Sequence, residues 1–87
     1  MNGFSDEDIA ACILALCRER GVGKTICPSE VARRLTSDGS DWRSLMPDVR
    51  AAAAALARDG RVVVLQKGVA IDPGAARGPI RLGLPSS

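Results

Sequence analysis

The segment Gly21-Val22-Gly23-Lys24-Thr25 contains the residue types that hold phosphate groups in nucleotide-binding loops. Such a loop ends in Gly-Lys-Thr or Gly-Lys-Ser and begins with another glycine, which would fall at position 18 here. Position 18 is Arg18. The loop would also have to leave a strand and enter a helix, whereas this segment follows a predicted helix and precedes a short extended stretch. We therefore predict a loop that ends a helix, with the Lys24 side chain in solvent.

Side chains that act as nucleophiles, bases or metal ligands are few. The chain has three cysteines, Cys12, Cys17 and Cys27, but no histidine and no tyrosine. The commonest general base and the commonest metal ligand are therefore both missing. Cys12 and Cys17 lie on diverging faces of one predicted helix, so neither a disulfide nor a shared metal site is expected. We expect reduced, mostly buried thiols in a cytoplasmic protein, with no metal, no cofactor and no enzymatic activity.

Basic side chains are the remaining candidates for binding. The formal net charge is +2, but residues 1–42 carry five basic and seven acidic groups, while residues 43–87 carry seven basic and three acidic groups. The two parts therefore have net charges of −2 and +4. The candidates for contacts to nucleic-acid phosphates lie in the second part: Arg43, Arg50, Arg58, Lys67 and Arg77. A solvated surface would explain the same residues equally well.

The first predicted helix has clear end signals. Ser5 can cap it, Asp8 stands at the capping-box position, and Phe4 with Ile9 can form a hydrophobic staple. Gly21 ends the helix. Its apolar residues fall within one arc of a helical wheel: Ile9, Cys12, Ile13, Leu16 and Cys17. Leu14 lies off this arc, so we expect it on the surface, alone or as part of a face that binds a partner.

The rest of the chain predicts two more helices and several short strands. Pro28 opens the second helix after a strand over 25–27, and Pro47 restarts helical structure that runs to about Asp59 after a turn over 41–45. Further extended segments are predicted over 61–67, 69–71 and 80–84, with a loop over 72–79. Either Val62 and Val64 or Val63 and Leu65 could face the core, because alternation fits both registers.

This element order is that of an α+β winged helix-turn-helix, with three helices and a small antiparallel β-hairpin or sheet. We predict a single domain over residues 5–84, between an N-terminal tail over 1–4 and a C-terminal tail over 85–87. The longest apolar stretch, residues 9–17, is too short to cross a bilayer, so no membrane association is expected.

The surface residues of the third predicted helix indicate that the protein does not recognise a particular DNA sequence. With Val49, Ala52, Ala53 and Leu56 toward the core, the opposite face carries Pro47, Ala51, Ala54 and Arg58. Alanine cannot hydrogen-bond to a base edge, and each suitable bidentate pair would supply about 1–3 kcal/mol of discrimination. An alanine face is equally suited to close helix–helix contact.

At residues 42–50, 66–68, 72–73 and 76–82 the chain resembles a bacterial family of small uncharacterised domains that is considered winged-helix-like. The resemblance covers nearly the whole chain, and Trp-Arg-x-Leu-Met-Pro and Arg-Gly-Pro-Ile-Arg-Leu are its specific segments. It implies a fold and a bacterial cytoplasm but no activity. We expect its polar residues to converge on one side of the third helix and hairpin, among them Trp42, Arg43, Arg50, Gln66, Lys67 and Arg77.

The sequence thus predicts a nucleic-acid-binding domain, with DNA as the first expected partner and with low sequence selectivity. The alternative is a protein-interaction or dimerisation module that uses the alanine-rich face of the third helix, together with Leu14 or Trp42. We identify no small-molecule substrate.

Overall fold

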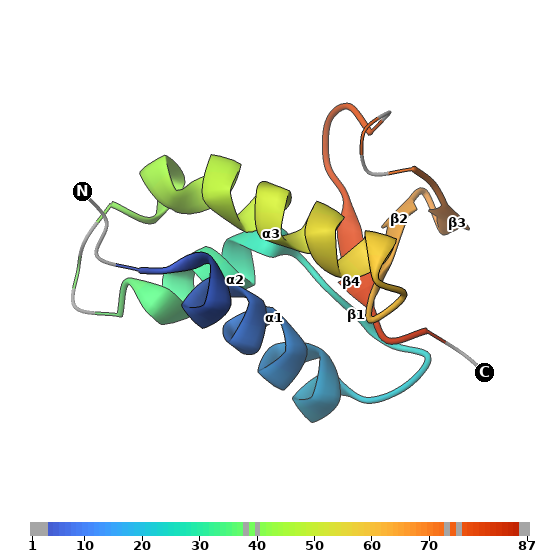
Figure 1. The fold of residues 1–87 in the computed structure, drawn as a ribbon, viewed down its shortest axis with the longest axis horizontal. Coiled ribbons are helices and arrows are strands. Elements are labelled where there is room, and N and C mark those ends of the chain that lie inside the picture. The colour runs from blue at the N-terminus through green and yellow to red at the C-terminus, as the bar shows by residue number, and fades with distance from the viewer. Residues whose placement is uncertain (1–3, 38, 40, 73, 75, 86–87) are drawn as a thin grey trace.

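The chain forms three α-helices, one 3-10 helix and a four-stranded antiparallel sheet (Figure 1). The structure is a computed structural model that describes residues 4–37, 39, 41–72, 74 and 76–85. The predicted tails therefore lie mostly outside the described residues, as do positions 73 and 75 of the predicted loop. The elements in chain order are α1 (Asp6–Arg20), β1 (Thr25–Ile26), α2 (Pro28–Leu35), η1 (Trp42–Leu45), α3 (Met46–Arg58), β2 (Val63–Gln66), β3 (Val69–Ala70) and β4 (Arg81–Gly83).

The three helices pack on one another, and the sheet lies against them at the end of α3 (Figure 1). The strand order is β1-β4-β2-β3, so the first strand pairs with the last one. Val62 and Val64 are buried, which settles the register that the sequence left open. The largest fully buried side chains come from helices and strands alike: Ile9, Ile13, Ile26, Val31, Leu45, Val49, Val64 and Leu82.

The beginning of α1 follows its sequence signals. The backbone N–H of Asp8 donates to Ser5 Oγ, and the N–H of Ser5 donates to Asp8 Oδ2, each at 3.1 Å. The surface position expected for Leu14 is wrong, because its side chain is only 6% exposed. α1 contacts both α2 and α3, so its buried arc is wider than the single stripe that the helical wheel suggested.

The strands are shorter than predicted, but they follow one another along the chain as predicted. Residues 61–67 yield only β2, and residues 80–84 yield only β4. Between β2 and β3 the chain turns at Lys67 and Gly68, which have φ angles of +53° and +80°. Two successive positive φ values are typical of the type I′ turn that matches the twist of a two-stranded hairpin. The mixed α+β class is thereby confirmed. No helix in the described part of the chain is long and apolar enough to cross a membrane.

The three thiols differ in exposure. Cys17 is buried, at 1% exposed, whereas Cys12 and Cys27 are half-buried. All three are free, and burial raises the pKa values of the Cys12 and Cys17 thiols. A raised thiol pKa means that less of the reactive thiolate is present at neutral pH. Among the described residues, no group of histidine, cysteine or acidic side chains is placed to hold a metal ion.

Candidate nucleic-acid interface

The segment between β2 and β4, residues 67–80, is called the hairpin tip below, and side chains of α3 and β2 hold it in place. Arg50 Nη1 donates to the Gly78 carbonyl at 3.2 Å. Gln66 Nε2 donates to the Arg77 carbonyl, and also to the Pro79 carbonyl at 3.3 Å. Figure 1 shows this segment rising beside α3. Of the polar residues expected to converge on one side of the third helix, Arg50 and Gln66 both contact the hairpin tip, whereas Trp42 and Arg43 lie in η1, before α3.

Through these contacts Arg50 and Gln66 hold the hairpin tip in place. Arg50 is half-buried and directs one of its N–H groups to the Gly78 carbonyl. Gln66 was expected among the polar residues of this side, but its role as the second anchor was not predicted. A polar amide at the end of a strand, next to a turn, is the only sequence signal that could have suggested it.

Two predicted site residues, Lys67 and Arg77, lie around one surface hollow of about 300 Å³ together with Arg81 of β4. The other lining residues are Leu65, Gln66, Pro79 and Ile80, so none of the described residues around the hollow has a carboxylate. Lys67 and Arg77 are both exposed. Exposed cationic side chains such as these two attract anions.

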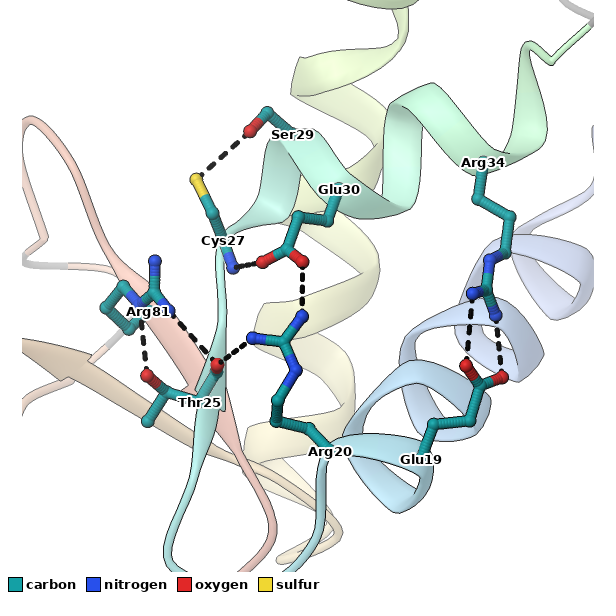
Figure 2. Close-up of polar contacts among 8 residues, drawn as sticks. All are labelled: Glu19, Arg20, Thr25, Cys27, Ser29, Glu30, Arg34 and Arg81. Carbon is teal, nitrogen blue, oxygen red and sulfur yellow. Dashed lines mark hydrogen bonds and ion pairs between the residues drawn. The ribbon is translucent and has the colours of Figure 1, made fainter.

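Arg81 is oriented by hydrogen bonds to β1. Its Nε donates to Thr25 Oγ1 and its Nη2 to the Thr25 carbonyl, each at 3.0 Å (Figure 2). The same carbonyl accepts from Arg20 Nη1 at 3.0 Å. Two guanidinium groups therefore converge on one carbonyl oxygen.

Glu30 compensates one of these two charges. Its Oε1 lies 2.5 Å from Arg20 Nη2, and its Oε2 accepts from the Cys27 backbone N–H at 2.7 Å (Figure 2). The Cys27 N–H, followed by the Arg20 guanidinium, holds the pKa of Glu30 below its ordinary value. The carboxylate thus closes the first turn of α2 and pairs with Arg20, while Arg81 has no ion pair in the described structure.

Arg34 also forms an ion pair with a carboxylate. It donates to both carboxylate oxygens of Glu19, at 2.7 and 3.0 Å (Figure 2). This hydrogen bonding lowers the pKa of Glu19 and raises that of Arg34. Arg20 and Arg34 are therefore neutralised within the fold, and the cations left for a ligand lie elsewhere.

The remaining predicted site residues lie along α3 and at its beginning. Arg58 is exposed in the last turn of α3. Arg43 belongs to η1, where its guanidinium stacks on Trp42, so it lies at the other end of α3 from Arg58 and is not part of the hollow. The predicted core face of α3 is confirmed, since Val49, Ala52, Ala53 and Leu56 are all buried.

The other flank of α3 is acidic. A second hollow of about 300 Å³ lies between the start of α1 and α3. Its floor consists of small and apolar residues, Ala10, Ala51, Ala52, Ala55 and Leu56, and its charged lining residues are Asp6, Glu7, Asp59 and Arg61. α3 therefore separates a basic flank, beside the hairpin tip, from a flank with three carboxylates and one arginine.

Fold and site together define a small mixed α+β domain that presents a cationic hairpin tip beside its third helix. The chain belongs to the family described as "Protein of unknown function (DUF3253)", whose model matches residues 6–85. This confirms the expected membership in a family of uncharacterised domains. None of the curated proteins matches the chain.

Proposed function

We propose that this chain is a winged helix-turn-helix domain that binds duplex DNA with low sequence selectivity and catalyses no reaction. Three helices followed by an antiparallel hairpin, with a strand between the first two helices, are the elements of that fold. In this arrangement the third helix approaches the major groove and the hairpin tip reaches the flanking backbone. α3 and residues 67–80 would take these roles.

The observation that carries the proposal is the hollow lined by Lys67, Arg77 and Arg81. Its cations have no carboxylate among the lining residues, whereas Arg20 and Arg34 elsewhere in the fold do have one. The hairpin tip that carries two of them is hydrogen-bonded to Arg50 and Gln66, so less conformational entropy is lost on binding. A pre-positioned cationic surface suits the phosphate backbone.

Low selectivity follows from the surface of α3. Its exposed or half-buried side chains include Ala51, Ala54 and Ala55, none of which can hydrogen-bond to a base edge. Arg50 is engaged with Gly78, which leaves Arg58 as the polar side chain of this flank most available to a groove. Phosphate contacts position a protein on DNA but do not distinguish sequences.

Fluorescence anisotropy with a labelled duplex tests the proposal. The wild-type chain should bind two unrelated duplexes with similar Kd, and the affinity should fall steeply between about 50 and 200 mM salt because counterions are released. The double variant K67Q/R77Q removes two cations that would face phosphates, and at 150 mM salt each removal should weaken binding by about fivefold. R18Q/R34Q removes the same charge outside the interface and should bind nearly as the wild type does. Absence of wild-type binding at the lowest salt would refute the proposal.

A second candidate function is protein binding through the alanine-rich flank of α3, and the hollow beside Asp6 and Glu7 favours it. Exposed Ala51 and Ala55 allow close approach of a helix. The three carboxylates select a partner helix with basic residues beside its apolar stripe, and they disfavour a symmetric dimer in which this flank would face itself. Titration with a basic amphipathic helical peptide separates the candidates, because peptide binding without DNA affinity would favour this second one. A tight dimer in sedimentation equilibrium would contradict the expected basic partner.

A further inference from the structure

Trp42 and two arginines form a second cationic group at the beginning of α3. The Trp42 ring is half-buried against the core, and the guanidinium carbons of Arg33 and Arg43 lie 4.5 and 4.6 Å from its centroid. Arg33 comes from the last turn of α2 and Arg43 from η1. The three residues are called the arginine–tryptophan cluster below. The two guanidinium carbons can be no farther apart than the sum of these distances, so the fold holds two like charges close together.

Neither charge of the cluster is compensated in the described part of the chain. Arg34, the residue after Arg33, donates twice to Glu19, but Arg33 and Arg43 have no ion pair or side-chain hydrogen bond there. Asp41 accepts from the backbone N–H of Arg43 rather than from its guanidinium. A guanidinium stacked on a ring keeps its N–H donors in its own plane, where they remain free for a ligand.

These properties select an anion with several oxygens. Planar guanidinium groups bind phosphate oxygens in a bidentate manner, and stacking on a fixed ring limits the rotamers that the arginines lose on binding. An anion shared by Arg33 and Arg43 would also relieve their mutual repulsion. Because guanidinium groups already stack on the Trp42 ring, phosphate contact suits the cluster better than stacking of a base.

We infer that the arginine–tryptophan cluster is a second phosphate-contact site for nucleic acid, separate from the hairpin tip. The inference rests on the proposed DNA binding. The hairpin tip is anchored to the middle of α3, whereas the residues of the cluster belong to α2 and η1, which precede α3 in the chain. α3 has 13 residues. Arg50, which anchors the tip, is the fifth of them and follows Arg43 by seven residues, so at about 1.5 Å per residue the two sites lie roughly 10 Å apart along the helix, close to the major-groove width of about 12 Å. A helix in that groove would place the cluster at the phosphates of one strand and the tip at those of the other.

Salt-dependent binding tests this assignment. With a labelled duplex of about 20 base pairs, R33Q/R43Q should reduce the slope of log K against log salt concentration by about 2, since each phosphate contact contributes about 0.9. The matched control R18Q/R34Q removes the same charge, including that of the ion-paired neighbour of Arg33, and should leave the slope nearly unchanged. Circular dichroism checks that all variants are folded.

Trp42 provides a second readout, because it is the only tryptophan of the chain. Its emission should change when wild-type protein is saturated with DNA, and also when K67Q/R77Q is saturated. If wild-type protein binds DNA but R33Q/R43Q keeps the wild-type slope, or if Trp42 emission stays constant at saturation, this inference is overturned while the proposed function stands. If wild-type protein binds no DNA, both are overturned.

Discussion

Lys67 adopts a backbone conformation that is unfavourable for a lysine. Its φ of +53° is the only positive value of a non-glycine residue among those described, and it stands at the first central position of the Lys67-Gly68 turn. Asparagine and glycine adopt such angles at less cost than a long side chain does. A residue held in a sparsely populated region supports the hypothesis that its side chain has a function.

We therefore predict that K67N raises stability and lowers DNA affinity together. The free energy of unfolding should increase by about 0.5–1 kcal/mol, because the turn becomes less strained. Urea denaturation and anisotropy measure the two effects. K67R keeps both the charge and the strain, so it should match the wild type in stability and affinity. A K67N variant that is stabilised but binds DNA unchanged would remove Lys67 from the interface.

Because of Glu30, the free energy of unfolding should depend on pH in the acid range. Its pKa is below the ordinary value of 4.5, chiefly through the Cys27 backbone N–H and then through Arg20. A carboxyl with a lowered pKa in the folded state stabilises fully above its unfolded pKa, and this stabilisation is lost as the pH falls through the folded value.

E30Q should thus cost about 1 kcal/mol at pH 7, the typical net value of a hydrogen bond. The difference from wild type should shrink as the pH falls below 4.5, which urea midpoints at pH 7 and pH 3 would measure. E19Q is the matched control. Glu19 also has a lowered pKa, but its pair with Arg34 is exposed, so its loss should be smaller. Equal effects of E30Q at both pH values would contradict this account.

At the scale of elements, the hairpin tip is held in two ways: Ile80 is buried in the core, with Ile71 and Ala76 packed against it, and surface hydrogen bonds hold residues 77–79. The three hydrogen bonds, from Arg50 and Gln66, are exposed, while the core lies beneath α3 and the sheet. Segments with exposed hydrogen bonds and few buried contacts open without global unfolding.

Q66A should consequently accelerate amide hydrogen exchange at Arg77 and Gly78 while changing the free energy of unfolding by less than about 1 kcal/mol. DNA affinity should fall as well, because the looser tip must be ordered on binding. S44A removes a comparable exposed hydrogen bond, to the Asp41 carbonyl, and should leave exchange in the tip unchanged. Unaltered exchange in Q66A would show that the anchor does not order the tip.

Some features of the helices and strands could be predicted from short-range sequence signals, and others could not. The capping box at Ser5 and the proline at the start of α2 followed from the sequence, since each depends on neighbours in the chain. The order of the strands in the sheet did not, because β1 pairs with β4 from the other end of the chain. Leu14 did not, because its burial depends on where α2 and α3 pack against α1. Strand lengths were overestimated because pairing partners, which the sequence does not reveal, determine where a ladder ends.

At the scale of the whole molecule, the proposed DNA binding depends more on where the charges lie than on the net charge of +2. Acidic Asp6, Glu7 and Asp59 line one flank of α3, and the cationic hairpin tip occupies the other. A helix is about 10–12 Å across, which exceeds the screening length of about 8 Å at physiological ionic strength.

The double variant D6N/E7Q therefore tests whether DNA affinity depends on the local cationic site or on the net charge of the protein. The change would raise the net charge from +2 to +4. DNA affinity at about 150 mM salt should still change less than twofold, because the acidic flank is screened from the interface. Stability should fall by about 0.3–1 kcal/mol for each residue, since both carboxylates oppose the positive end of the α1 dipole. Anisotropy and thermal unfolding measure these effects. An affinity gain as large as the loss in K67Q/R77Q would favour overall charge over the local site.

The sequence by itself determined the α+β class, the helix starts, the excess of positive charge in residues 43–87 and the alanine surface of α3. Composition and short-range signals are sufficient for these. Only the tertiary structure decided which arginines remain uncompensated. Arg33 and Arg34 are adjacent, yet one stacks on Trp42 and the other pairs with Glu19. Such a difference depends on contacts between residues far apart in the chain, and those contacts exist only after the helices and the sheet have packed.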